Sequence, residues 1–214
     1  MKYTIGYIDE EPQFVDKFKR DLEDYFEIKT FKISPETSID NIIQEIINAE
    51  LDCLLVDFEL NETEAIQFNG NEIVDNLRKL RPYFPVFIIT GKEEDDVLDQ
   101  VEDGDIVRLK EELNDKREIL VQRIKIKIES YLKQIATAET TIKSLIQKRD
   151  EMGGLSIKEG EQLHKNYTFL NAVYPEEITV PETFIQPNVI TEINSFSNEA
   201  REILEELKKL NNNG

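Results

Sequence analysis

The segment LDCLLVDFELNE, residues 51–62, contains an almost unbroken apolar run that is followed by a single carboxylate, Asp57. A short apolar run bounded by polar residues is typical of a strand that is buried on both faces of a parallel sheet. A charge at the end of such a strand is costly to bury unless it has a partner or a chemical role. The segment therefore predicts a central strand, and it marks Asp57 as a candidate functional residue.

Strand and helix patterns alternate on both sides of this segment. Further strand patterns occur at residues 3–8, 27–33, 85–90 and 104–109. Apolar residues recur at helical spacing in residues 14–26, 40–50 and 71–81, and more weakly in residues 94–102. This alternation predicts an α/β domain in which helices cover both faces of a doubly wound, five-stranded parallel sheet. Active sites in such sheets lie at the carboxyl ends of the strands.

The second half of the chain has a different period. Apolar residues at spacings of three and four predict a long helix of coiled-coil type over residues 115–151, which Gly153 and Gly154 end. The apolar stripe of this helix consists of Val121, Ile124, Ile128, Tyr131, Ile135, Ala138, Ile142, Leu145 and Met152. The spacing does not decide between a partner helix in the same chain and a second copy, so a homodimer through this helix stays open.

Two further amphipathic helices are predicted at residues 163–174 and 193–210, with a proline-rich connector between them. Because these patterns differ from those of the first half, we predict two domains. Residues 1–113 form the α/β domain, and residues 114–214 form an all-α domain, a coiled coil or helical hairpin.

Composition narrows the class of protein. The net charge of −19 argues against binding to nucleic acid, because phosphate contacts need lysine and arginine. Most of this charge lies in residues 1–114, which contain 29 acidic and 12 basic residues. No apolar run approaches the roughly 20 residues that span a bilayer, and the first residues show no signal-peptide pattern. With Cys53 as the one cysteine, these features predict a cytoplasmic protein without membrane association. The one histidine, His164, is predicted to face solvent.

The polar residues that follow the predicted strands would meet at one edge of the sheet. Asp9 and Glu10 follow the first strand, Asp57 ends the third, Thr90 ends the fourth and Lys110 follows the fifth. Carboxylates this close repel one another, and a divalent cation that prefers oxygen ligands, Mg²⁺, would relieve the repulsion. With the cation and Lys110 to balance the developing charge, Asp57 could accept a phosphoryl group as a nucleophile.

Four motifs in order, GYIDEEP, LDCLLVDFEL, PVFIITG and DIVRLK, resemble those of the receiver domain of two-component response regulators. The resemblance covers about residues 1–113. It implies a flavodoxin-like fold with strand order 2-1-3-4-5. It also implies that Asp57 receives its phosphoryl group from a phosphohistidine on a sensor histidine kinase.

The resemblance assigns roles to the other residues of this edge. Asp9 and Glu10 would be the acidic pair that binds Mg²⁺, together with Asp57 and the backbone carbonyl of Glu59. Thr90 and Lys110 would hold the oxygens of the phosphoryl group.

Several positions depart from the family's pattern. Glu111 stands where receivers usually carry proline, Val107 stands where many have a switching aromatic residue, and the loop after the third strand is longer. Glu59 and Lys92 occupy positions that flank the path of the hydrolytic water in receivers. An opposite-charge pair there would obstruct the water, so we predict slow autodephosphorylation.

These observations support one main hypothesis and two alternatives. The main hypothesis is a response regulator whose helical second half signals to a downstream protein, still unknown, by protein–protein interaction. The alternatives are a phosphate sink or intermediary of a phosphorelay, and a transcription regulator with an atypical helical DNA-binding tail. In the main hypothesis the chain has no enzymatic activity beyond its own phosphorylation and dephosphorylation.

Overall fold

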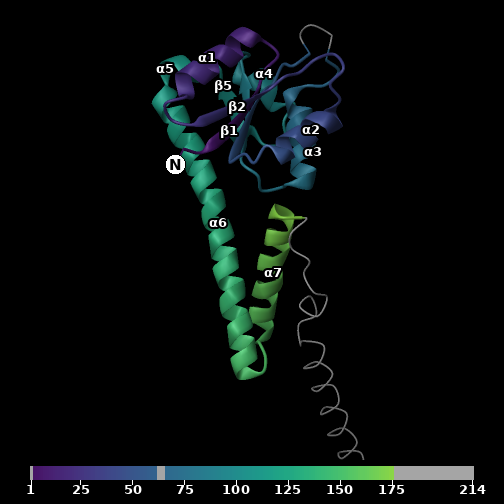
Figure 1. The fold of residues 1–214 in the computed structure, drawn as a ribbon, viewed down its shortest axis with the longest axis vertical. Helices are drawn as coiled ribbons and strands as arrows, with labels where there is room; N and C mark the ends of the chain where they lie inside the picture. Colours follow the sequence, from purple (N-terminus) through teal and green to yellow (C-terminus); the bar gives the residue numbers. More distant parts are fainter. Residues whose placement is uncertain (1, 62–65, 176–214) are drawn as a thin grey trace, which may run out of the picture. The chain divides into compact units, whose positions relative to one another are not determined.

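The computed structural model describes residues 2–61 and 66–175. The chain separates into two compact units, Met1–Lys133 and Gln134–Gly214 (Figure 1). The predicted division at residue 113 stays a prediction, whereas the boundary between the compact units lies inside a helix. The proline-rich connector beyond residue 175 and the last predicted helix, residues 193–210, lie outside the described residues.

The first unit contains a five-stranded parallel sheet in the order β2-β1-β3-β4-β5. Its strands are β1 (Thr4–Ile8), β2 (Glu27–Phe31), β3 (Cys53–Asp57), β4 (Val86–Thr90) and β5 (Val107–Leu109). Every residue of β3 and β4 is buried, as their apolar runs predict, whereas β2 lies at an edge and is partly exposed. The predicted fold class and strand order are confirmed.

Helices connect the strands and continue beyond the sheet. The helices of the first unit are α1 (Pro12–Leu22), α2 (Ile39–Asn48), α3 (Gly70–Leu80), α4 (Glu94–Leu98) and α5 (Glu112–Asp115), with a 3-10 turn η1 (Gly104–Ile106) before β5. The long helix α6 (Arg117–Met152) extends into the second unit, where α7 (Ile157–Val173) follows it.

Several predicted element bounds are wrong. The helix predicted at residues 94–102 ends at Leu98, and the strand predicted at residues 27–33 ends at Phe31. The first helix ends at Leu22 rather than residue 26. Residues 104–106 belong to a turn rather than to the fifth strand, because the side chain of Asp103 accepts a hydrogen bond from the amide of Asp105 and turns the chain there.

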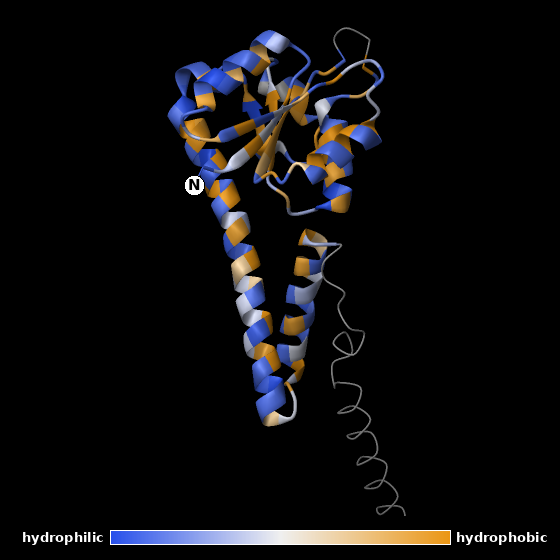
Figure 2. Cartoon of the chain, viewed as in Figure 1, coloured by the Kyte–Doolittle hydropathy of each residue, from blue (hydrophilic) through white to orange (hydrophobic). Residues whose placement is uncertain are grey.

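A hydrophobic core lies on each face of the sheet. The core on the side of α2, α3 and α4 includes Ile42, Ile46, Leu54, Val56, Ile73, Leu77, Ile88 and Val97. The core on the side of α1 and the first part of α6 includes Ile5, Tyr7, Phe18, Leu22, Cys53, Leu55, Ile89 and Ile124. Figure 2 shows the apolar strands in orange between helices whose outer faces are largely blue. Cys53 is therefore a buried core residue, as predicted.

The apolar stripe of α6 packs in two different environments. In its first part Val121, Ile124 and Ile128 are fully buried in the core with residues of the sheet and α1, so they are not the seam of a coiled coil. In its second part the buried residues belong to the second unit and are Ile135, Ala138, Ile142 and Leu145. Spacing of three and four identifies the buried face of a helix but not what covers it, which explains why the coiled-coil interpretation fails for the first part.

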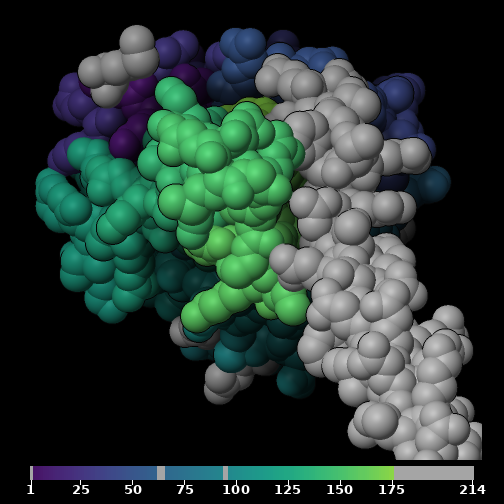
Figure 3. All heavy atoms as spheres, turned by 90° about the horizontal axis from the view of Figure 1, so that it is seen from below, coloured from purple at the N-terminus to yellow at the C-terminus, as the bar shows by residue number. Residues whose placement is uncertain are grey.

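In the second unit, the end of α6 and α7 form a hairpin (Figure 1). Gly153 ends α6 with a left-handed backbone angle φ of 76°, as the glycine pair predicts. Lys148 of α6 forms an ion pair with Glu159 in the first turn of α7. The turn between α6 and α7 faces the viewer in Figure 3. Met152, the last residue of α6, is 72% exposed, so it is not a packing residue of the stripe. Leu163, Leu170 and Val173 are buried on α7, in agreement with the amphipathic helix predicted at residues 163–174.

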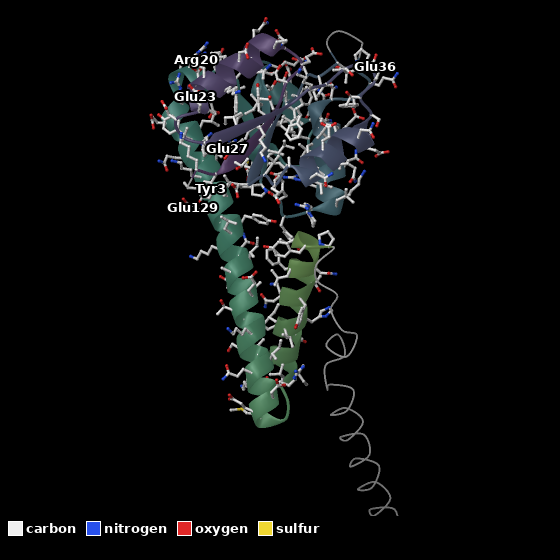
Figure 4. The ribbon with its side chains drawn as sticks, viewed as in Figure 1. Tyr3, Arg20, Glu23, Glu27, Glu36 and Glu129 are labelled. Carbon is white, nitrogen blue, oxygen red and sulfur yellow. The ribbon has the colours of Figure 1, made fainter. Side chains whose placement is uncertain are left out.

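Most charged side chains lie on the outside. Exposed acidic residues such as Glu23, Glu27 and Glu36 surround the first unit (Figure 4), and His164 is exposed on α7, as predicted. Among the described residues, the buried polar or charged side chains are those of Asp9, Asp57 and Thr90. No described helix combines the length and apolar character needed to cross a membrane.

Candidate functional site

The buried polar residues lie at the carboxyl ends of neighbouring strands. Asp57 ends β3, Thr90 ends β4, and Lys110 directly follows β5. Residues Ile8 of β1 and Val56 of β3 are paired, so the residues that follow them, Asp9 and Asp57, come next to each other. The backbone amide of Lys110 donates to the carbonyl of Thr90 at 2.7 Å. The structure thus brings together four of the residues predicted for this edge.

The ammonium group of Lys110 connects the two buried carboxylates. Its Nζ lies 3.0 Å from Asp57 Oδ2 and 3.1 Å from Asp9 Oδ2. The two aspartates are only 3% and 4% exposed. The same Nζ lies 4.1 Å from the centre of the Phe14 ring, which belongs to α1. Two carboxylates and one ammonium leave one negative charge uncompensated within this triad, and a buried charge of this kind favours a bound cation or proton.

The site shifts the pKa values of its charged groups. Burial, and then the charge of Asp9, raise the pKa of Asp57 to about 7, although Lys110 acts to lower it. Burial lowers the pKa of Lys110, but the charges of Asp57 and Asp9 more than offset burial and hold that pKa above its usual value. Lys110 is therefore a cation at neutral pH, whereas Asp57 readily takes up either a proton or a metal ion.

Asp9 is held by donors from its own segment as well as by Lys110. The hydroxyl group of Tyr7 donates to Asp9 Oδ2 at 2.6 Å, and the amide of Glu11 donates to Asp9 Oδ1 at 2.9 Å. Burial, and then the charge of Asp9, raise the pKa of Tyr7, so its hydroxyl stays protonated. Sequence reasoning missed Tyr7. Its spacing from Asp9 could have identified it, because residues two apart in a strand lie on the same face of the sheet.

The loop after β4 brings the two predicted flanking residues together. Lys92 Nζ lies 2.5 Å from Glu59 Oε1, so the opposite-charge pair that we predicted is present. The backbone amide of Lys92 donates to Thr90 Oγ1 at 3.0 Å. The hydroxyl proton of Thr90 thus remains available for an acceptor at the site.

Comparisons with known proteins give the fold. No protein-family model matches the chain, and no curated protein matches it. The solved structure of NtrX from Brucella abortus in complex with ADP is similar at 18% sequence identity, with a TM-score of 0.50, over 71% of this chain and 34% of its own. A response regulator receiver protein from Sinorhizobium medicae is similar at 17% identity, with a TM-score of 0.48, over 61% of this chain and 97% of its own. The BeF3-activated DrrB receiver domain is similar at 20% identity, with a TM-score of 0.44, over 60% of this chain and 99% of its own.

The order of the parallel strands and the helices on both faces of the sheet are those of receiver domains. The first unit has the receiver fold. We refer to the described residues of Met1–Lys133 as the receiver unit.

The structure also shows where two further residues named in the sequence analysis lie. Val107 begins β5 and is 1% exposed in the core that also contains Val97, so it is a packing residue in this structure. Glu10, the second member of the predicted acidic pair, directly follows the buried Asp9 and is half-buried.

Sequence reasoning missed a glycine, Gly70, that allows α3 to lie against the backbone of Asp57. Gly70 is the first residue of α3, and its amide donates to the carbonyl of Phe58 at 3.0 Å. A Cβ atom at this position would lie 2.0 Å from the backbone oxygen of Asp57. Helix α3 can therefore approach the end of β3 this closely only because residue 70 has no side chain.

The chemistry of this edge fits a hydrated magnesium ion. Mg²⁺ is commonly bound by one or two carboxylates and several waters. The uncompensated charge of Asp9 and Asp57 and the raised pKa of Asp57 both favour such an ion. No group of three or more acidic, histidine or cysteine side chains in the described residues is arranged to hold a metal. Backbone and water oxygens would therefore have to complete the shell, which agrees with a role for the Glu59 carbonyl.

Proposed function

We propose that the chain is a two-component response regulator that accepts a phosphoryl group on Asp57 from a phosphohistidine of a sensor histidine kinase. The observation that carries the proposal is the buried Asp57 carboxylate at the end of β3, held 3.0 Å from Lys110 Nζ. The same ammonium contacts Asp9 at 3.1 Å, so it lies among the groups that would surround a transferred phosphoryl group. The receiver fold of this unit agrees with that use of the site.

The residues of the site can perform the transfer with balanced chemistry. A carboxylate oxygen of ionised Asp57 attacks phosphorus, and a P–O bond forms while the P–N bond to the kinase histidine breaks. The imidazole leaves with the bonding electron pair and takes up a proton. Lys110 balances negative charge on the transferred oxygens, and the Thr90 hydroxyl donates a hydrogen bond to one of them.

Magnesium would supply a second positive charge at the transferred oxygens and would keep Asp57 ionised. Asp9, Glu10, Asp57 and the Glu59 carbonyl are the residues that would hold it. Because the pKa of Asp57 is about 7 without metal, a large share of the acceptor would otherwise be protonated near neutral pH.

Acetyl phosphate with Mg²⁺ is expected to add one phosphoryl group to the chain, on Asp57. Asp57→Asn should abolish the modification, and Lys110→Ala should slow it by about 100-fold, the usual effect of removing one charge-stabilising group. Intact-mass and peptide mass spectrometry measure both effects. Lys79→Ala is the matched control, because Lys79 is an exposed lysine of α3 away from the site. Undiminished labelling of Asp57→Asn would reject the proposal.

The ion pair between Glu59 and Lys92 is expected to slow loss of the phosphoryl group. Lys92→Ala should speed autodephosphorylation about two- to fivefold, because a partly exposed ion pair is worth about 1 kcal/mol or less. The decay of the labelled protein after removal of acetyl phosphate measures the rate, with Lys79→Ala as the control. If Lys92→Ala loses phosphate no faster than the parent, the pair does not obstruct water.

The output that we propose is a protein–protein interaction governed by α6. Only Glu111, the short helix α5 and Lys116 separate Lys110 from α6. Helix α6 packs on the sheet at Ile124 and runs unbroken to Met152. A change at Lys110 and Thr90 could therefore alter the packing of α6 at its base. Beryllofluoride with Mg²⁺ should change the helicity, size or partner binding of the full chain, measured by circular dichroism and light scattering. No change in any of them would contradict this coupling.

A further inference from the structure

Tyr7 is a buried phenol whose position is fixed on two sides. It is 1% exposed in β1, and its ring stacks on that of Phe18 with ring centres 3.8 Å apart and an angle of 5° between the planes. A buried tyrosine hydroxyl requires a hydrogen-bond partner. The partner here is Asp9 Oδ2, at 2.6 Å. Because the stacked ring cannot shift freely, the hydroxyl constrains where Asp9 Oδ2 lies.

The donors around Asp9 are divided unequally between its two oxygens. Oδ2 accepts from the Tyr7 hydroxyl and is within 3.1 Å of Lys110 Nζ, so both of its lone pairs have a donor. Among the described residues, Oδ1 accepts a hydrogen bond only from the amide of Glu11, at 2.9 Å. One lone pair of Oδ1 is therefore left for a cation or for a water molecule bound to one.

We propose that Tyr7 is a positioning residue of the metal site. Its hydroxyl holds the Asp9 carboxylate in the orientation that reserves Oδ1 for a divalent cation or its water. This inference rests on the proposed function, because it assigns Tyr7 a role in the same phosphoacceptor site. Groups that orient a metal ligand in this way commonly change metal affinity by 10- to 100-fold when they are removed.

The test compares Tyr7→Phe with Tyr25→Phe in the full chain. Tyr7→Phe removes the hydroxyl but keeps the ring that stacks on Phe18. Tyr25 is the matched control, because its hydroxyl also donates to a carboxylate at 2.6 Å, that of Glu118, but on an exposed surface. Mn²⁺ binding is followed by electron paramagnetic resonance. Binding that remains in Asp57→Asn is taken as binding outside the site and is subtracted from the binding of each protein.

Tyr7→Phe is expected to weaken Mn²⁺ binding at the site about tenfold, whereas Tyr25→Phe should leave it unchanged. In acetyl phosphate labelling, the Mg²⁺ concentration for half-maximal rate should rise by a similar factor, while the rate at saturating Mg²⁺ stays near that of the parent. If Tyr7 had only a structural role, Tyr7→Phe would lower thermal stability. It would not raise the Mg²⁺ concentration for half-maximal rate while leaving the rate at saturating Mg²⁺ unchanged. Equal Mn²⁺ affinities of folded Tyr7→Phe and the parent would overturn the inference.

A second measurement covers the case in which Tyr7→Phe does not fold. In the parent chain with ¹³C-labelled tyrosine, Mg²⁺ should shift the ring signal of one buried tyrosine, and no shift of any tyrosine signal would overturn the inference. Failure of the proposed function looks different: the parent would bind Mn²⁺ in an Asp57-dependent way and yet take no phosphoryl group from acetyl phosphate or a kinase.

Discussion

The metal-free protein at about pH 8 is expected to be less stable than its Asp57→Asn variant by roughly 2–4 kcal/mol, and the difference should shrink as the pH falls toward 4. The pKa of Asp57 is about 7 in the folded protein and has an ordinary value of 3.8. The folded state therefore binds this proton more tightly than the unfolded state does. Stability falls as the pH rises through the window between the two values, because ionisation of the buried carboxylate is then required. Asparagine stays neutral, so the variant lacks this dependence.

Urea denaturation of both proteins in a chelator, at several pH values, measures the difference. The comparison cancels the contributions of the other carboxylates, which the two proteins share. Lys110 keeps Asp9 as a partner in the variant, so its charge is not left unpaired. Addition of Mg²⁺ at pH 8 should stabilise the parent and have little effect on Asp57→Asn, because the ion offsets the charge of the ionised carboxylate, which the variant lacks. A difference between the two proteins that does not change with pH would contradict the prediction.

The sequence predicted the site residues that depend on where each strand ends. A polar residue after an apolar run can be recognised locally, and the parallel arrangement then places Asp9, Asp57, Thr90 and Lys110 at one edge. The ion pair of Glu59 and Lys92 was predicted because the resemblance places both residues beside the acceptor. The edge residues were thus predictable from where each strand ends, whereas the ion pair needed the resemblance as well.

What the sequence could not predict depends on what lies opposite a residue in space. The spacing of the α6 stripe identified a buried face, but Val121 and Ile128 pack on the sheet, and no pattern within the helix distinguishes a sheet from a second helix. In the sequence, Tyr7 looks like any other apolar strand residue, and only the structure shows that its hydroxyl contacts Asp9. Gly70 follows a long loop, and its importance depends on how closely α3 approaches β3.

Gly70→Ala is expected to destabilise the protein by about 2–4 kcal/mol and to slow labelling of Asp57. The added Cβ would lie 2.0 Å from the backbone oxygen of Asp57 and 2.9 Å from a methyl carbon of Val56, both in the central strand β3. Backbone in the middle of a sheet cannot move aside without breaking its pairing on both sides, so α3 must shift instead. That shift would break the hydrogen bond from the Gly70 amide to Phe58 and disturb the segment that carries Glu59.

Gly91→Ala is the matched control for this substitution, because it too lies beside the site. Among the described residues, a Cβ there would meet only a side-chain carbon of Lys110, at 3.9 Å, which is an ordinary contact distance. Urea denaturation and acetyl phosphate labelling of the two variants separate the effects on stability and on the acceptor. The close approach of α3 predicts a large loss of stability for Gly70→Ala and a change within about 0.5 kcal/mol for Gly91→Ala. Equal stabilities of the two variants would mean that α3 does not lie this close to the strand that carries Asp57, and the geometry inferred for the acceptor would then be wrong.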